Sequence, residues 1–269
     1  MIGAVEADLA TAVAAIARAA GAAILEVYAA PVESVQKADD SPLTVADLKA
    51  HGLITAALAR LTPALPVLSE ESEPASVAAR RDWPRYWLVD PLDGTREFLS
   101  RNGEFTVNIA LIEGGRPRLG VVHIPVGDCS YVGIPGAGAW RRTGDGTAEP
   151  LAVRDGVAAT PRVLGSRSHR GQSLDAFLAR LGAHELVSAG SALKFCRLAE
   201  GAADLYPRLS PTSEWDTAAG QAVVEAAGGH VVTLSGTPLR YNERETLLNP
   251  SFLACAGDPG RWLGLISAG

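Results

Sequence analysis

Two aspartates, Asp90 and Asp93, follow an apolar run, Trp87 to Val89, almost directly. An apolar run of this kind predicts a buried strand. Pro91 fixes its own backbone and pushes Asp90 toward an extended conformation, so we expect the strand to end there. Carboxylates are the hard oxygen ligands that Mg²⁺ and similar cations prefer, so this pair suits a metal site.

The step from Gly94 to Thr95 comes directly after these aspartates and can begin a helix. The first N–H groups of a helix have no partner within it, and together with the helix dipole they favour an anion. Metal ligands beside an anion-binding helix start suit metal-assisted phosphoryl transfer. An Asp-Gly turn with a capping aspartate is the structural alternative, and the spacing alone does not separate the two interpretations.

Four further sequence blocks accompany the central segment, WLVDPLDGTREF at 87–98. They are KADDSPLTVAD at 37–47, LSEES at 68–72, RNGEFTVNIALIEGG at 101–115 and SEWDTAAGQAVVEAAGG at 213–229. In this order and spacing, the blocks resemble the inositol monophosphatase superfamily of metal-dependent, lithium-sensitive phosphatases across nearly the whole chain. DGTREF followed by RNGEFTVNIALI is similar to the bacterial 3′(2′),5′-bisphosphate nucleotidases of the CysQ type. Inositol phosphatases more often carry Thr-Asn where this chain has Arg96-Glu97.

The periodicity of the chain predicts the elements that position these blocks. Apolar residues at steps of three and four predict helices over 5–27 and 44–61. In the second helix the expected inward positions are Leu48, Ile54, Leu58 and Leu61. Residues 87–140 are rich in strand patterns, and the polar stretch 141–150 predicts a loop. Beyond it, strands and helices alternate, which indicates an α/β layer.

The resemblance implies a fold of the α/β class, a layered α-β-α-β-α sandwich. An α+β N-terminal half, residues 1–145, would carry most of the metal ligands. An α/β C-terminal half, residues 146–269, would carry Asp216 and the block that selects the substrate.

The resemblance also implies which groups hold the metal ions. The implied ligands are the carboxylates of Glu70, Asp90, Asp93 and Asp216 and the backbone carbonyl of Leu92. An all-oxygen set favours Mg²⁺, with two or three ions in the site, and also suits Mn²⁺. Four carboxylates converge only around cations, because their repulsion otherwise raises their pKa values. From the residues alone, Glu70 could be a solvated turn acid, and Asp216 could cap a helix over 217–227.

A second constellation concerns the attacking water. The family uses the residues that match Asp47 and Thr95 to orient this water, and Glu70 is expected to help align it. The N–H groups of Gly94 and Thr95 would hold phosphate oxygens. Thr44 to Asp47 also reads as a capping box with Asp in place of the usual Glu, and the two roles are compatible.

The block GSALKFCRLAEGAADLYPRL at 190–209 concerns the substrate. Lys194 and Arg197 lie three apart on an expected helix and could form an ordinary solvated face. Bisphosphate nucleotidases resemble this block, which implies that Lys194 binds the phosphate that is not cleaved, with Arg208 as a second candidate. A buried phosphate needs such a positive partner. The implied substrate-binding set is Glu70, Leu92, Asp93, Gly94, Thr95, Lys194, Arg208 and Asp216.

Composition excludes several other kinds of protein. The net charge of −6 argues against a nucleic-acid surface, which needs a basic face, but a small anionic substrate is compatible with it because a metal ion reverses the local field. The three cysteines and five histidines lack the spacing of a zinc site.

The N-terminus lacks the positive segment of a signal peptide, and no stretch approaches the roughly 20 apolar residues of a transmembrane segment. We therefore expect a cytoplasmic protein. Peripheral association with the cytoplasmic face of the inner membrane stays open, as does the choice between monomer and homodimer.

The expected activity is hydrolysis of adenosine 3′,5′-bisphosphate, a by-product of sulfur assimilation, to AMP and phosphate. Its substrate would be a small nucleotide bisphosphate. One alternative is an inositol or sugar monophosphatase on the same scaffold. A second, from another class, is an inactive nucleotide-binding regulatory protein.

Overall fold

The computed structural model describes residues 4–29, 34–36, 42–156, 158–167 and 171–267. Its helices are α1 (Ala4–Tyr28), α2 (Val45–Leu61), α3 (Pro74–Ala79), α4 (Thr95–Leu99), α5 (Gln172–Leu181), α6 (Leu193–Ala199), α7 (Ala218–Ala226) and α8 (Gly260–Ser267), with a short 3₁₀ helix at Arg80–Asp82. Part of the first block, residues 37–41, lies outside the described residues.

Two large mixed sheets carry the fold. The first has the strand order β3-β4-β5-β6-β7-β8-β9, and β3 and β4 are its one parallel pair among the described strands. Its strands are β3 (Val67–Ser69), β4 (Arg85–Asp93), β5 (Thr106–Glu113), β6 (Arg116–Ile124), β7 (Cys129–Ile134), β8 (Gly138–Thr143) and β9 (Glu149–Leu151). The second has the order β11-β10-β12-β14-β13. Its strands are β10 (Arg162–Ser166), β11 (Glu185–Ala189), β12 (Leu205–Arg208), β13 (His230–Thr233) and β14 (Phe252–Cys255). A separate ladder pairs β1 (Ser34–Gln36) with β2 (Pro42–Thr44).

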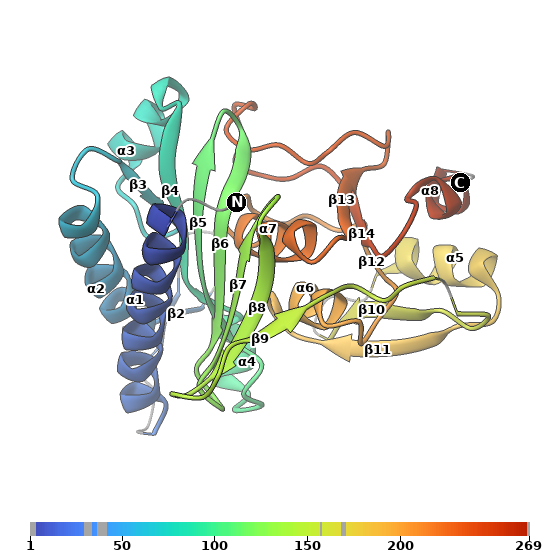
Figure 1. Cartoon of the computed structure of the whole chain (residues 1–269), viewed down its shortest axis with the longest axis horizontal. Helices are drawn as coiled ribbons and strands as arrows, with labels where there is room; N and C mark the ends of the chain where they lie inside the picture. Colours follow the sequence, from blue (N-terminus) through green and yellow to red (C-terminus); the bar gives the residue numbers. More distant parts are fainter. Residues whose placement is uncertain (1–3, 30–33, 37–41, 157, 168–170, 268–269) are drawn as a thin grey trace.

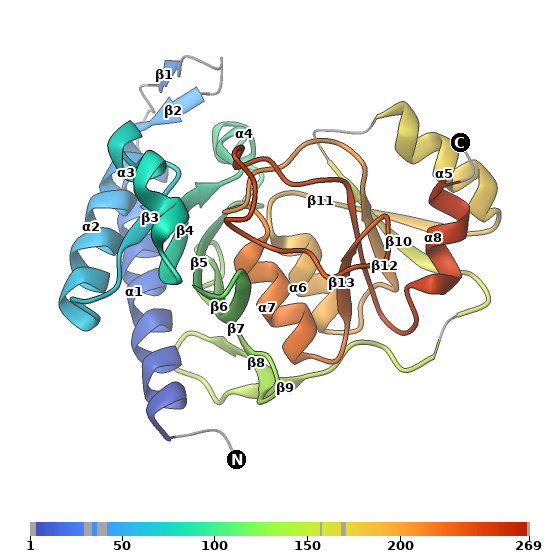
Figure 2. The same cartoon turned by 90° about the horizontal axis from the view of Figure 1, so that it is seen from above.

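Helices and sheets alternate in layers. Helices α1 and α2 cover the outer face of the first sheet, and α5 and α8 lie beyond the second sheet (Figure 1). Helices α6 and α7 lie side by side between the two sheets (Figure 2). This arrangement confirms the expected α-β-α-β-α sandwich.

The apolar run in β4 is continuous because helices cover both faces of the first sheet. Trp87 and Val89 join the cluster that packs against α1 and α2, whereas Tyr86 and Leu88 join the cluster beneath α6 and α7. Successive side chains of a strand point to opposite faces, so a strand covered on both sides needs apolar residues at every position. The apolar run therefore places the carboxylates that follow it at the end of a rigid, central strand.

Two local expectations for the motif region and α2 are wrong. Strand β4 continues past Asp90 to Asp93, with a register shift against β5 between these residues. Pro91 cannot donate to a strand ladder, and an irregularity in pairing accommodates it. In α2, Leu48 and Leu61 are 51% and 38% exposed instead of inward, because the sheet and α1 cover only a narrower stripe of this helix.

The prediction of a loop over 141–150 is wrong in part. Strands β8 and β9 form a hairpin there that extends the first sheet to Leu151. The first sheet therefore runs past residue 145, where the N-terminal half was expected to end. Helix α7, from the C-terminal half, packs on β6 and β7 of the first sheet. The two halves thus share one of the three hydrophobic clusters found among the described residues.

Within the described part of the chain, one helical stretch, Glu6–Tyr28 of α1, is long and apolar enough to cross a membrane by length and composition. The expectation that no stretch comes near this limit is therefore wrong. Ala10, Val13, Ala17 and Ala20 of this helix are buried, and it contacts α2 and strands β5, β6 and β7. These are the contacts of an amphipathic helix packed on a sheet, and they explain its apolar composition.

The contact between α1 and β6 can be tested at Gly21. A Cβ atom there would lie 2.5 Å from Cδ2 of His123, a buried ring whose Nδ1 is hydrogen-bonded to Ser130 Oγ at 2.9 Å. We expect Gly21→Ala to lower the free energy of unfolding by about 1–3 kcal/mol through overpacking, measured by urea denaturation. Gly52→Ala is the matched control, because Gly52 is exposed on α2 with no atom within 4 Å, and should raise stability by about 0.4–1 kcal/mol. Equal effects of the two substitutions would contradict this packing.

Candidate active site

The first two acidic residues of the site emerge together from a parallel strand pair. Strand β3 pairs with β4 so that Ser69 lies opposite Val89, and the N–H of Glu70 donates to the carbonyl of Val89 at 3.1 Å. Parallel strands end at the same edge of a sheet. Glu70 and Asp90 therefore lie next to one another at this edge.

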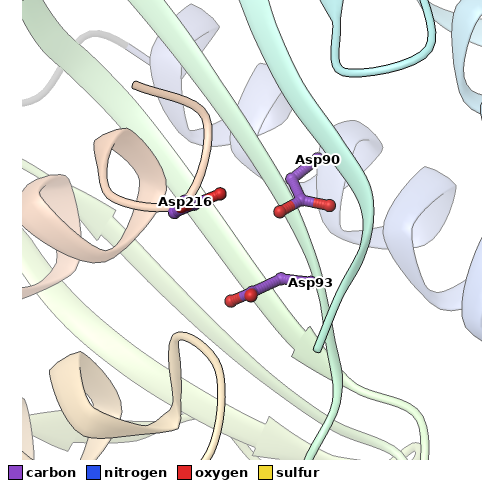
Figure 3. Close-up of side chains that lie close together, drawn as sticks. All are labelled: Asp90, Asp93 and Asp216. Carbon is purple, nitrogen blue, oxygen red and sulfur yellow. The ribbon is translucent and has the colours of Figure 1, made fainter. Parts of the chain in front are cut away.

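Three carboxylates converge at this point (Figure 3). Asp90 and Asp93 come from the end of β4, and Asp216 approaches them from the turn before α7; one oxygen of each lies within 4.8 Å of the others. Asp216 does not cap α7. Its Oδ2 accepts the N–H of Ser213 at 2.8 Å, and α7 begins only after Thr217. The turn thus directs Asp216 toward β4.

The pKa values of these groups are raised although Lys194 and Arg208 lie nearby, so the repulsion among the carboxylates is only partly offset. Burial, together with the neighbouring Asp93 and Glu70, raises the pKa of Asp216 to about 8. Burial also raises the pKa of Asp90, helped by Glu70 and Asp93. A divalent cation bound among these oxygens would remove the repulsion, so the donor set fits a hard metal ion.

Two buried polar residues of β5 orient Asp93, and the sequence interpretation missed both. The side-chain amide of Asn108 donates to Asp93 Oδ2 at 3.3 Å, and the hydroxyl of Thr106 lies 3.4 Å from the same oxygen. Polar side chains two apart in the otherwise apolar strand FTVNIALI were the available signal, since a central strand has no solvent-facing side.

The turn after the aspartates has the expected form. Gly94 has φ +91°, and helix α4 begins at Thr95. A Cβ atom on Gly94 would overlap the hydroxyl oxygen of Ser191, which belongs to the C-terminal half. Glycine is therefore required there both by conformation and by space.

One cavity of about 240 Å³ brings these groups together with basic ones. Of the residues predicted for the site, it is lined by Glu70, Asp90, Leu92, Asp93, Gly94, Thr95, Lys194, Arg208 and Asp216. Asp47 is fully buried outside this lining, and its charge contributes to the raised pKa of Asp90. The roles of all these residues stay predictions. Glu97, Ser191 and Tyr206 also line the cavity and were not predicted.

Lys194 does not belong to a solvated helix face. It is 4% exposed, and its ammonium group donates to the carbonyls of Ser191 at 2.7 Å and Ala189 at 3.2 Å. Burial lowers its pKa to about 8, an effect that Asp93 opposes. Arg197, one turn further along α6, is exposed. The solvated helix face therefore describes Arg197 but not Lys194.

Arg208 is the second basic group of the cavity, at the end of β12. Its Nη2 donates to the carbonyl of Pro211 at 3.0 Å. Its buried Nε has no hydrogen-bond partner among the described residues. An unsatisfied buried donor is costly, so an anion in the cavity would be a favourable partner for it.

Comparison with known proteins identifies the family. The sequence profile described as the inositol monophosphatase family matches residues 5–264. The chain belongs to the inositol monophosphatase family. It is 54% identical to the 3′(2′),5′-bisphosphate nucleotidase CysQ of Escherichia coli O157:H7 over 88% of this chain and 95% of that protein. The corresponding CysQ of Haemophilus influenzae is 34% identical over 92% of both chains.

A solved member of the inositol monophosphatase family, CysQ from Bacteroides thetaiotaomicron, has the same fold. Its TM-score with this chain is 0.82 at 43% sequence identity, covering 93% of this chain and 97% of the other. Members of the family are metal-dependent, which agrees with the acidic cluster of Asp90, Asp93 and Asp216.

Asp93→Asn tests the cluster as a metal site. We expect the loss of one charged ligand to weaken metal binding, measured by calorimetric titration with Mg²⁺ or Mn²⁺, and to lower metal-dependent phosphate release at least about a hundredfold. The unfolding temperature in metal-free buffer should change by no more than about 4 °C, because the amide replaces a buried carboxyl group that its neighbours repel. Asp8→Asn, at an exposed position of α1, is the control. Metal binding by Asp93→Asn as tight as that of the wild type would contradict the assignment.

Proposed function

We propose that this protein is a Mg²⁺-dependent phosphatase that removes the 3′-phosphate of adenosine 3′,5′-bisphosphate, releasing AMP and phosphate. The observation that carries the proposal is the presence of opposite charges in one cavity, with carboxylates on one side and the buried Lys194 and half-buried Arg208 on the other. A monophosphate would use only the acidic side through a metal. The names of the relatives in Escherichia coli and Haemophilus influenzae support the same substrate.

The acidic side would receive the phosphate that is cleaved. Mg²⁺ held by Glu70, Asp90, Asp93, Asp216 and the carbonyl of Leu92 would neutralise the phosphate and stabilise charge that develops on phosphorus and on the leaving oxygen. The N–H groups at Gly94 and Thr95 would hold a phosphate oxygen at the start of α4. The rigid end of β4 supplies the positional accuracy that in-line attack needs.

The attacking group in this proposal is water. Thr95 and Asp47 would orient it and take up its proton, with Glu70 beside them. Its oxygen forms the new bond to phosphorus, the bond between phosphorus and the 3′-oxygen breaks, and the 3′-oxygen takes up a proton to give AMP. No covalent phosphoenzyme is part of this scheme.

The basic side would bind the phosphate that is retained. The ammonium group of Lys194 is held by two carbonyls and Arg208 by one, so both are pre-organised with donors to spare. Such a site favours a dianionic 5′-phosphate over a neutral hydroxyl group, which would leave buried charges without a partner. The substrate is a small nucleotide, so we assign the enzyme to the cytoplasm.

Phosphate release from a panel of substrates tests the activity. We expect the highest kcat/KM for adenosine 3′,5′-bisphosphate, lower values for inositol 1-phosphate and fructose 1,6-bisphosphate, and no turnover when a chelator removes Mg²⁺. A preference for inositol 1-phosphate would instead identify a monophosphatase. Nucleotide binding without release from any substrate would identify a regulatory protein.

Lys194→Ala tests the basic side. We expect kcat/KM for adenosine 3′,5′-bisphosphate to fall about ten- to hundredfold more than that for adenosine 3′-monophosphate, because a charge-assisted contact is worth about 1.5–3 kcal/mol. The ratio between the substrates is decisive, since a packing defect lowers both activities together. Lys49→Ala, at an exposed site on α2 where Lys49 pairs with Glu26, should leave the ratio unchanged. An unchanged ratio in Lys194→Ala would remove this lysine from substrate recognition.

A further inference from the structure

The motif RNGEF contains an acidic residue, Glu104, that does not line the cavity. Its side chain joins the two halves of the chain at the edge of the cavity. The Glu104 carboxylate accepts hydrogen bonds from Nε and Nη2 of Arg167, both at 2.7 Å, and from the N–H of Gly190 at 2.8 Å. Arg167 directly follows β10 and Gly190 directly follows β11, so both partners come from the second sheet. Paired charges with a bidentate geometry make this a strong and directional link.

The segment that Glu104 holds is packed tightly against the first half. A Cβ atom on Gly190 would lie 2.7 Å from Cγ of Glu97 and 2.9 Å from the carbonyl oxygen of Glu104. Ser191 has φ +45°, a left-handed conformation that is unfavourable for a residue other than glycine. Its hydroxyl is within donating distance of two carbonyls, that of Glu104 at 2.7 Å and that of Asp93 at 2.9 Å. These contacts hold the strained residue in place.

The same segment holds the ammonium group of Lys194. Two of its carbonyls, of Ala189 and Ser191, accept the hydrogen bonds of Lys194. The position of this charge therefore depends on where the backbone from 189 to 191 lies. That backbone is fixed in turn by the side chain and carbonyl of Glu104. A continuous path of hydrogen bonds thus leads from Glu104 to the cation in the cavity.

We propose that Glu104 is a positioning residue for substrate selection: through Gly190 and Ser191 it fixes the ammonium group of Lys194, and so sets the preference for a substrate with a second phosphate. This proposal rests on the proposed function. A misplacement of about 1 Å is enough to weaken such a contact strongly, because a charge-assisted hydrogen bond needs short distances and good alignment.

The test compares kcat/KM for adenosine 3′,5′-bisphosphate and adenosine 3′-monophosphate, which differ only in the retained phosphate. In Glu104→Ala we expect the ratio to fall about tenfold, chiefly through KM for the bisphosphate, as for a weakened charge-assisted contact. Glu104→Gln keeps an acceptor for Gly190 and loses the charged pair with Arg167, so its ratio should fall less. If Glu104→Ala does not fold, the proposal is tested with Glu104→Gln and with Arg167→Ala, which also breaks the ion pair between Glu104 and Arg167.

A double-substitution cycle shows whether Glu104 acts through Lys194. In a Lys194→Ala background, Glu104→Ala should lower the ratio no further, because the group that it positions is gone. An additional, independent loss in the double variant overturns the proposal, and so does an unchanged ratio in Glu104→Ala.

Glu200→Gln is the matched control. Glu200 also joins the two halves, accepting Tyr131 of β7 at 2.9 Å and Arg141 of β8 at 3.2 Å, but it does not line the cavity. A general loosening of the contact between the halves would lower the ratio in this variant as well. We expect its ratio to equal that of the wild type; a fall as large as in Glu104→Gln overturns the proposal.

A second readout separates this proposal from the proposed function. The chain contains three lysines, Lys37, Lys49 and Lys194, so lysine labelled with ¹³C at Cε gives few NMR signals, and Lys194→Ala assigns the relevant one. We expect this signal to shift in Glu104→Ala and to stay in place in Glu200→Gln. If the wild type hydrolyses no bisphosphate nucleotide, the proposed function fails, and the Lys194 signal alone decides: a shift supports the positioning role and an unchanged signal overturns it.

Discussion

The active site depends on the repulsion among three closely spaced carboxylates beside the end of β4. Asp90, Asp93 and Asp216 are brought together by elements whose packing is independent of them: a central strand covered on both faces, and the turn before α7. Burial and proximity raise the pKa values of all three, so free energy from the core holds them in an unfavourable arrangement. A cation converts this cost into binding free energy, which is why the fold can place an all-oxygen site in its interior.

The cavity lies where the two halves meet, so its acidic groups come mainly from one half and its basic groups from the other. The carboxylates lie mainly on the first sheet, while Lys194 and Arg208 belong to α6 and β12 of the C-terminal half. Under the proposed function, a substrate with two phosphates would bridge the halves, whereas a substrate with one would engage mainly one side. Selectivity then depends on how accurately one half is held against the other, which is the physical basis for a role of Glu104 at the junction.

The two halves are held in a defined position because their backbones approach each other closely at the edge of the cavity. Gly94 and Gly190 leave no room for a side chain, and Ser191 adopts a left-handed conformation that its hydrogen bonds hold in place. Close packing of this kind transmits small displacements, since an interior at crystal-like density has little free volume in which to absorb them. The segments 94–104 and 189–191 are therefore packed directly against one another.

The sequence by itself determined the strand that carries Asp90 and the helix start at Thr95, through its apolar pattern and local turn chemistry. The order and spacing of the blocks determined the family. The layered fold followed only from the resemblance to that family, because the periodicity of the chain does not show how the layers stack. Only the tertiary structure decided that Leu48 and Leu61 are exposed, since exposure depends on which stripe of α2 a neighbouring layer covers. It also decided that Lys194 is buried, although its spacing from Arg197 fits a solvated face equally well. Glu104 gained its place near the site from contacts between the halves, which join residues far apart in the chain and leave no local pattern. Thr106 and Asn108 gained theirs from strand register, and their polar side chains in an apolar strand were the only local signal of it.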